Sequence, residues 1–222
     1  MTLAKICGLT TPETLTIAVE AGAAFVGLVA FEQSPRHLAP EAARRLLEQT
    51  GMVQDRRAKV VVVTVDPDDA LLDALTRHVV PDFIQLHGHE SPARAAAVRQ
   101  RTGAGIIKCL PVSGPEDLKP VADWAGVADH LMFDARTPAD ATLPGGMGLS
   151  FDWTLLQGLD LPRPWFLAGG LNPGNVAEAV RLSGAPMVDV SSGAERAPGV
   201  KEPALIRAFL EAAGTLPGKQ SS

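Results

Sequence analysis

The chain has 222 residues, 46% of them hydrophobic, and a formal net charge of −5 near neutral pH. This length suits one large domain, and the hydrophobic fraction is sufficient for a sizeable core. The negative charge leaves no electrostatic footprint for nucleic acid or an anionic membrane surface. No run of about 18 apolar residues exists, so the sequence predicts no membrane-spanning helix.

The cysteine content and the N-terminus indicate a cellular compartment. The two cysteines, Cys7 and Cys109, are too few for a disulfide framework. The N-terminus enters a strand-like run almost at once and shows no signal-peptide pattern. We therefore expect a protein of the reducing cytoplasm.

Short β-rich runs alternate with helical patterns along the chain, which is typical of parallel βα units. The predicted strands cover Ala4–Gly8, Phe25–Val29, Lys59–Val65, Phe83–His87, Ile106–Leu110, His130–Asp134, Trp165–Ala168 and Met187–Val190. The predicted helices cover Pro12–Ala21, Pro40–Thr50, Asp68–Arg77, Pro92–Thr102, Gly114–Ala122, Phe151–Gln157, Asn175–Leu182 and Pro203–Ala213.

Eight strands and eight helices predict a closed (β/α)8 barrel, the TIM barrel of the α/β class, in a single domain. A doubly wound sheet of six strands is the alternative, but it leaves two βα units without a place. We assign residues 1–213 to the barrel. Residues 214–222 are polar and rich in Gly, Pro and Ser, so we expect a flexible tail there.

Two turns of small residues near the C-terminus indicate a phosphate site. Each of the segments Phe166–Val176 and Val188–Glu195 begins with an apolar strand that runs into glycines or serines. Small residues let backbone N–H groups approach an anion, and a helix N-terminus adds a favourable dipole. Because the loops after strands seven and eight often bind phosphate in such barrels, we expect a phosphate ester as the ligand.

Two candidate proton-transfer groups end predicted strands, where barrels of this kind carry their chemistry. Alternation places Lys5 and Cys7 on one face of the first strand, toward the interior. For Cys7, a small buried thiol and a functional thiol are both open interpretations. Asp134 directly follows an apolar run, where an unpaired carboxylate is costly, so we favour an acid or base over a capping aspartate.

Three further side chains are candidates for binding or pairing. Arg36, held by the preceding proline, is suited to fork onto a carboxylate, although a solvated loop arginine is the alternative. His87 shares the inner face of its strand with Gln85 and either binds ligand or satisfies an internal hydrogen bond. Asp189 points opposite to its valine neighbours, and strand eight adjoins strand one, which predicts a buried Lys5–Asp189 ion pair.

The sequence lacks local metal or nucleotide motifs. Cys109 has no matching Cys or His spacing and is expected in the core, and the five histidines form no metal pattern. The glycine-rich segment Gly145–Gly148 follows a loop instead of a strand, so it is not a dinucleotide fingerprint. We interpret it as a mobile loop near the phosphate or over the ligand.

The motifs together resemble the phosphoribosylanthranilate isomerase family. The resemblance extends from Lys5 to about Ala208, and one departure is Met147, where the family often has threonine. The motifs are Lys5-Ile-Cys-Gly8, Ser34-Pro-Arg36, Gln85-Leu-His-Gly88, Phe133-Asp134, Gly145-Gly-Met-Gly148 before Phe151-Asp-Trp153, Leu167-Ala-Gly-Gly-Leu171 with Asn175-Val176, and Asp189-Val-Ser-Ser-Gly-Ala-Glu195 followed by Gly199-Val-Lys201.

The resemblance implies an Amadori rearrangement of N-(5-phosphoribosyl)anthranilate to 1-(2-carboxyphenylamino)-1-deoxyribulose 5-phosphate in tryptophan biosynthesis. By this similarity Asp134 is the general acid for the ring oxygen and Cys7 the general base for the C2 proton. Arg36 resembles the residue that holds the anthranilate carboxylate, and His87 is assigned to substrate binding. The rearrangement has no net redox change, so we expect neither metal nor cofactor. The phosphate is expected on backbone N–H groups near Gly169, Gly170, Ser192 and Gly193.

Three other functions are alternatives to the Amadori rearrangement. The resemblance of an indole-glycerol-phosphate synthase would be a site driven by Lys and Glu, and that of a pentose-phosphate epimerase a pair of aspartates that hold a metal. Cys7 with Asp134 suits neither enzyme. A noncatalytic phosphosugar sensor is the third, but binding alone needs neither Cys7 nor Asp134. The sequence leaves a monomer and a homodimer open.

Overall fold

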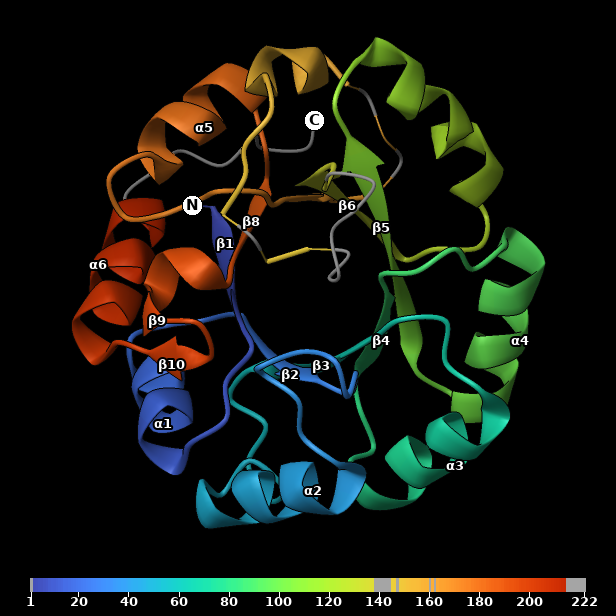
Figure 1. Ribbon diagram of the computed structural model, residues 1–222, viewed down its shortest axis with the longest axis vertical. Helices are drawn as coiled ribbons and strands as arrows, with labels where there is room; N and C mark the ends of the chain where they lie inside the picture. Colours follow the sequence, from blue (N-terminus) through green and yellow to red (C-terminus); the bar gives the residue numbers. More distant parts are fainter. Residues whose placement is uncertain (1, 138–144, 147, 160, 162, 215–222) are drawn as a thin grey trace.

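The protein folds into a closed barrel of eight parallel strands in sequence order, which confirms the predicted (β/α)8 architecture (Figure 1). The computed structural model describes residues 2–137, 145–146, 148–159, 161 and 163–214. The strands of the barrel are β1 (Leu3–Cys7), β2 (Phe25–Val29), β3 (Lys59–Thr64), β4 (Phe83–Leu86), β5 (Gly105–Val112), β6 (His130–Ala135), β7 (Phe166–Leu167) and β8 (Met187–Val190).

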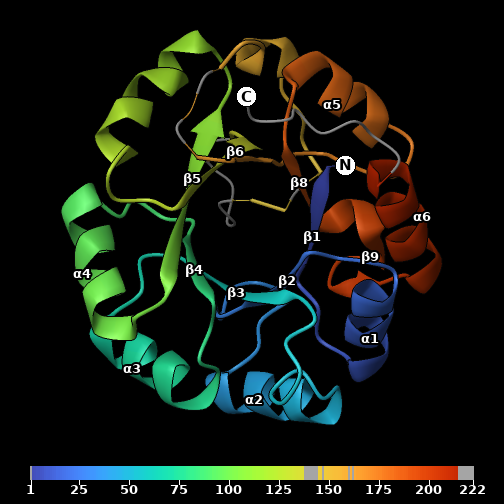
Figure 2. The ribbon, with the colours of Figure 1, turned by 180° about the vertical axis from the view of Figure 1, so that it is seen from behind.

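An outer ring of helices surrounds the strands in both views (Figures 1 and 2). Side-chain oxygens of Thr11, Asp68 and Ser91 accept hydrogen bonds from the first turns of α1, α3 and α4, which fixes where these helices begin. None of the helices within the described ranges has the length and apolar character needed to cross a membrane. The α-helices are α1 (Pro12–Glu20), α2 (Pro40–Gln49), α3 (Asp69–His78), α4 (Pro92–Thr102), α5 (Val176–Ser183) and α6 (Pro203–Gly214).

Two of the eight predicted helices are 3-10 helices instead of α-helices. The first, η1 (Pro115–Trp124), contains Pro120, whose missing N–H and ring are incompatible with an α-helical turn at that position. The second, η2 (Trp153–Leu156), is a single short turn, and Gln157 after it has an extended backbone. Both predicted helices are therefore present, but with 3-10 instead of α-helical geometry.

A small hairpin between β8 and α6 was not predicted. It follows the short turn η3 (Ser192–Ala194) and consists of β9 (Glu195–Ala197) paired antiparallel with β10 (Val200–Lys201). The turn of this hairpin packs on the loop after β2. The approach at Gly199 is so close that an added Cβ would lie 2.7 Å from the Pro35 carbonyl oxygen. The hairpin thereby brings Glu195 and Lys201 to the barrel mouth.

The C-terminal boundary differs slightly from the prediction. Helix α6 includes Gly214, the first residue of the predicted tail. Residues 215–222, the rest of the predicted tail, lie outside the described residues.

Strand alternation separates an outer core from an inner one, and the side chains of β1 lie on the predicted faces. Ala4 and Ile6 of β1 lie in the layer between strands and helices, whereas Cys7 belongs to the inner layer with Val29 and Val63. A second inner cluster fills the barrel below them and comprises Phe25, Val61, Ile107, Cys109, Met132, Phe166, Ala168 and Met187.

The predicted ion pair between the first and last strands is confirmed. The register of β1 and β8 sets Lys5 opposite Asp189, and Lys5 Nζ lies 2.9 Å from Asp189 Oδ1. Lys5 is completely buried, which opposes its charged form, but the Asp189 carboxylate outweighs this and raises the pKa of Lys5 above its usual value.

We expect Lys5→Met to lower the free energy of unfolding by about 3–5 kcal/mol, because it leaves the Asp189 carboxylate buried without its partner. Urea unfolding followed by circular dichroism measures this loss. The double variant Lys5→Met/Asp189→Leu should recover much of it, since a buried pair can be replaced by apolar groups. A Lys5→Met protein as stable as wild type would show that the pair does not neutralise a buried charge.

Candidate active site

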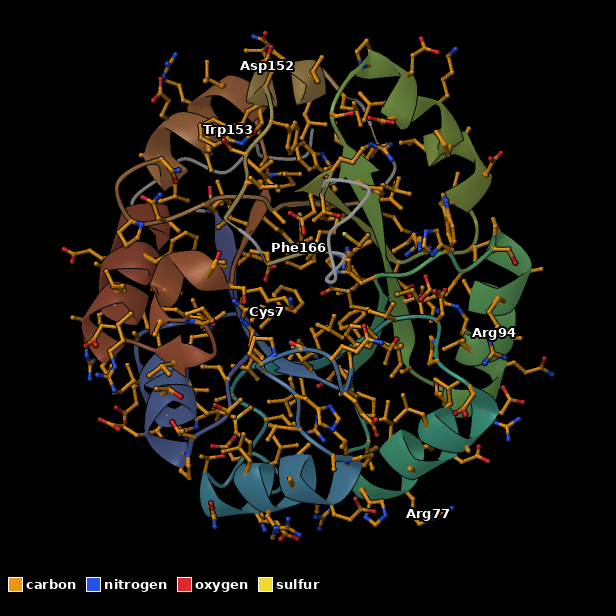
Figure 3. All side chains as sticks on the ribbon, viewed as in Figure 1. Cys7, Arg77, Arg94, Asp152, Trp153 and Phe166 are labelled. Carbon is orange, nitrogen blue, oxygen red and sulfur yellow. The ribbon has the colours of Figure 1, made fainter. Side chains whose placement is uncertain are left out.

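A cavity opens at the C-terminal ends of the strands and encloses about 850 Å³, including part of its open mouth. Cys7 lies inside the ring of elements, at the end of β1 (Figure 3). Gly193 does not line this cavity and packs just behind it, against the Leu171 carbonyl. The other predicted site residues all line it: Cys7, Arg36, His87, Asp134, Gly169, Gly170 and Ser192.

Cys7 and Asp134 approach the cavity from different sides of the barrel. Cys7 ends β1 and Asp134 lies near the end of β6, with β7 and β8 between these strands in the closed ring. Both residues are almost fully buried, with 7% and 8% of their surface exposed. Asp134 Oδ1 accepts the Ala135 N–H at 2.8 Å, which fixes the carboxylate beside the loop of Gly169. A ligand in the cavity can therefore have a sulfur on one side and a carboxyl group on another.

The guanidinium group of Arg36 is forked onto an internal carboxylate, Glu195. Arg36 Nε and Nη2 donate to the two Glu195 oxygens at 2.7 and 2.8 Å, and Nη2 also donates to the Gly146 carbonyl at 3.3 Å. Arg36 Nη1 has no hydrogen-bond partner among the described residues. The sequence predicted that Arg36 binds a carboxylate, but it did not identify Glu195. Because Glu195 and Gly146 occupy Nε and Nη2, Nη1 is the nitrogen left for a ligand.

Lys201 joins this pair from the β10 strand. Its Nζ lies 2.6 Å from Glu195 Oε1 and 2.9 Å from the Ser191 carbonyl oxygen. Burial lowers the pKa of Lys201, and the Glu195 carboxylate counteracts that shift. Burial also opposes ionisation of Glu195, but Arg36 and Lys201 hold the pKa of Glu195 below its usual value. These three groups form a buried, charged cluster of which Arg36 lines the cavity.

The charges around Cys7 are unequal in number. Three cations, Lys5, Arg36 and Lys201, interact electrostatically with the sulfur of Cys7. In the described part of the chain, two carboxylates, Asp189 and Glu195, pair with them. The described charges beside the sulfur therefore sum to one positive charge.

His87 contacts the acid side of the cavity. Its Nε2 lies 3.4 Å from Asp134 Oδ2 and 3.4 Å from Cys109 Sγ, and its Nδ1 lies 3.2 Å from Gln85 Nε2. Burial opposes the imidazolium form, but interactions with Cys109 and Asp134 outweigh burial and raise the pKa of His87 well above its usual value. Burial also raises the pKa of the Cys109 thiol.

The loops after β7 and β8 present unpaired backbone donors. Gly169 and Gly170 adopt φ values of +88° and +64°, which favour glycine. In the parts of the chain that the structure describes, the backbone N–H groups of Gly169, Gly170, Ser192 and Gly193 donate to no protein acceptor. Adjacent unpaired N–H groups of this kind form an anion-binding rim.

We expect Gly193→Ala to weaken the binding of inorganic phosphate by about 10- to 100-fold, the effect of losing a hydrogen bond to a charged ligand. A Cβ at Gly193 would lie 1.9 Å from the Leu171 carbonyl oxygen, so the two loops must separate. Isothermal titration calorimetry measures the change. Gly126→Ala is the matched control because a Cβ there meets no atom within 4 Å. Equal phosphate affinity in both variants would place the anion elsewhere.

The glycine-rich segment bridges the two sides of the cavity. A Cβ at Gly145 would lie 2.7 Å from His87 Nε2, and the Gly148 carbonyl oxygen lies close to Gly170. Its position near the phosphate loops agrees with the interpretation made from the sequence, whereas its mobility stays a prediction. Met147 lies outside the described residues.

The fold and the cavity define the class of this protein, a (β/α)8-barrel enzyme with titratable side chains at the C-terminal ends of its strands. Residues 4–212 match the family model of N-(5'-phosphoribosyl)anthranilate (PRA) isomerase. The chain belongs to this family.

Individual relatives are similar over nearly their whole length. An N-(5'-phosphoribosyl)anthranilate isomerase from Caulobacter sp. (strain K31) is 56% identical over 212 residues, covering 96% of this chain and 98% of the relative. One from Paracoccus denitrificans is 53% identical over 206 residues, covering 93% and 94%. The crystal structure of phosphoribosyl anthranilate isomerase from Thermotoga maritima superimposes with a TM-score of 0.84 at 31% identity, covering 97% of this chain and all of that one.

Proposed function

We propose that the protein catalyses the Amadori rearrangement of N-(5-phosphoribosyl)anthranilate to 1-(2-carboxyphenylamino)-1-deoxyribulose 5-phosphate in tryptophan biosynthesis. Membership of the PRA isomerase family supports this proposal. A similar phosphoribosyl anthranilate isomerase structure, with a TM-score of 0.80 and 30% identity over 97% of this chain, contains reduced 1-(o-carboxyphenylamino)-1-deoxyribulose 5-phosphate. The observation that carries the proposal is one cavity lined by Cys7, Asp134 and an anion-binding rim.

The reaction requires two proton transfers on different sides of the sugar. Asp134 donates a proton to the furanose ring oxygen, the bond from that oxygen to C1 breaks, and an iminium forms between C1 and the anthranilate nitrogen. Cys7, as a thiolate, removes the C2 proton. The released electron pair forms the C1–C2 double bond and neutralises the iminium, and the resulting enolamine tautomerises to the ketone. Each transfer by a positioned group contributes about 10²- to 10⁴-fold in rate.

The electrostatics of the cavity support this division of roles. Three cations, Lys5, Arg36 and Lys201, interact electrostatically with the base, Cys7. On the acid side, the raised pKa of His87 keeps a proton within 3.4 Å of Asp134. The proposed base and the proposed acid therefore have different charged neighbours.

Two anionic ends of the substrate fix its reacting carbons between these groups. The phosphate binds the N–H groups of Gly169, Gly170, Ser192 and Gly193, and the anthranilate carboxylate binds Arg36 Nη1. His87 contributes to substrate binding from the acid side. Such positioning supplies several kcal/mol of the barrier lowering.

We expect Arg36→Ala to raise KM by about 10- to 100-fold with a smaller effect on kcat, because the contact to the carboxylate is made in both ground and transition states. Steady-state kinetics separate the two parameters. Glu195→Gln is the companion variant, since it keeps Arg36 while removing the charge of its internal partner. An unchanged KM for Arg36→Ala would show that the substrate carboxylate binds elsewhere.

The proposed function is tested by incubating the purified protein with N-(5-phosphoribosyl)anthranilate and separating substrate and product by chromatography. Formation of the aminoketose supports the proposal. Binding of the reduced product analogue without turnover would instead identify a phosphosugar sensor, and turnover only of a pentose phosphate would identify an epimerase.

The assembly and the compartment belong to the same proposal. We expect a cytoplasmic monomer or homodimer, and light scattering after gel filtration distinguishes the two assemblies. A related structure from Thermotoga maritima is described as monomers generated from a dimeric enzyme. Cell fractionation tests the compartment.

A further inference from the structure

Three side chains with metal-binding atoms meet beside the acid of the proposed reaction: His87, Cys109 and Asp134. Their ligand atoms all lie within 4.8 Å of one another. Cys109 has no part in the proposed reaction, and its proximity to His87 was not predicted from the sequence. Imidazole, thiolate and carboxylate are the ligand types that zinc uses in proteins.

We propose that His87, Cys109 and Asp134 form a binding site for a thiophilic divalent cation, zinc in the first place, and that the bound ion inhibits the enzyme. Binding of this ion is not a step of the proposed rearrangement, which needs no metal. Its inhibitory effect rests on the role proposed for Asp134, whereas the binding itself does not.

Two of the three separations between the ligand atoms match those of a zinc site. With zinc bonds of 2.0–2.3 Å, the ligand atoms of a tetrahedral site lie about 3.3–3.6 Å apart. His87 Nε2 already lies 3.4 Å from Cys109 Sγ and 3.4 Å from Asp134 Oδ2. The remaining separation, between sulfur and carboxylate, is at most 4.8 Å, so these two groups must approach by no more than about 1.2 Å.

The barrel places the three ligands by strand register. Leu86 of β4 is paired with Lys108 of β5, so the next residues, His87 and Cys109, are neighbours. Strand β5, which carries Cys109, has β4 on one side and β6 on the other. Asp134 of β6 is paired with Pro111 of β5, two residues beyond Cys109. Ligands that lie on or directly after adjacent barrel strands are held by the sheet, so little ordering is needed when an ion binds.

Gln85 provides the outer contact that orients a metal-binding histidine. Gln85 is 1% exposed, and its Nε2 lies 3.2 Å from His87 Nδ1, while its Oε1 is buried without a partner in the described part of the chain. Rotating the amide by 180° places Oε1 where it accepts the Nδ1–H of His87. Metal-binding histidines almost always donate their second N–H in this way, which leaves Nε2 to face the ion.

An ion at this position has a route of entry and a clear effect. His87 and Asp134 line the cavity, so the ion enters from it, and Cys109 releases its thiol proton as the bond to zinc forms. Three protein ligands leave a fourth coordination position for water or a substrate oxygen. The coordinated Asp134 oxygen is no longer able to carry the proton that the ring oxygen requires, so turnover falls.

Zinc titration of the untagged, chelator-treated full-length protein tests the proposal by calorimetry. We expect one zinc per chain in wild type and in Cys7→Ala, and at least about 100-fold weaker binding in Cys109→Ala and Cys109→Ser. The two Cys109 variants guard against a failure of either one to fold. Cobalt titration adds a signature, a thiolate-to-metal absorption band that disappears in both Cys109 variants.

Activity measurements test the inhibitory effect. Zinc should inhibit wild type reversibly, with recovery on adding a chelator, while Cys109→Ala should retain basal turnover and resist zinc. Equal zinc affinity of wild type and Cys109→Ala, or no binding by wild type, would overturn the proposal. Cys109-dependent binding in a protein without isomerase activity would uphold the metal site and refute the proposed function instead.

Discussion

Cys7→Ala is expected to reduce kcat by at least about 100-fold while the fold is retained. The reason is that alanine offers no group able to remove the C2 proton, whereas the phosphate rim and Arg36 stay in place to bind substrate. Cys7 lies in a small inner cluster with Val29 and Val63, so its removal creates only a small cavity. Steady-state kinetics measure the loss, and circular dichroism checks the fold.

The chain contains a matched control for this experiment. Cys109 is the other cysteine, is also buried, and also lies in the barrel interior, but it is not among the residues that line the cavity and neither donates nor accepts a proton in the proposed reaction. Cys109→Ala should therefore keep its turnover in metal-free buffer. Near-normal activity of Cys7→Ala, or an equal loss in both variants, would show that Cys7 is not the base.

The strands and their inward faces could be predicted because local pattern determines them. Apolar runs bounded by helical segments located all eight strands, and alternation correctly placed Lys5 and Cys7 inside. Closing the barrel then made Asp189 a neighbour of Lys5 without any further information. The 3-10 geometry of η1 and η2 was not predicted. Pro120 is incompatible with an α-helical turn in η1, and η2 is a single short turn although the helical pattern in the sequence is longer.

The contacts that the sequence did not reveal join residues far apart in the chain. Arg36 and Glu195 are separated by 159 positions, and their pairing depends on a hairpin too short to show a strand pattern. The one signal in the sequence for a role of Glu195 and Lys201 was that both belong to the C-terminal motif of the family. The His87, Cys109 and Asp134 cluster has one ligand from each of three βα units, so no local metal spacing exists to be recognised.

Asp134→Asn is expected to reduce kcat by at least about 100-fold, because the amide has a similar shape but no acidic proton for the ring oxygen. It should also lower the pKa of His87, whose imidazolium form is stabilised by the Asp134 carboxylate. Kinetics measure the first effect, and nuclear magnetic resonance titration of the His87 ring measures the second. The two readouts separate loss of the acid from general damage to the site.

The same substitution changes how stability depends on pH. A histidine whose pKa is raised on folding adds stability that is fully present below its unfolded pKa of about 6.5. That stability is lost as the pH rises through the higher pKa of the folded state. In Asp134→Asn this loss should shrink, so urea unfolding at pH 6 and pH 9 should differ less than in wild type. Normal turnover by a variant with a lowered His87 pKa would assign ring opening to another acid.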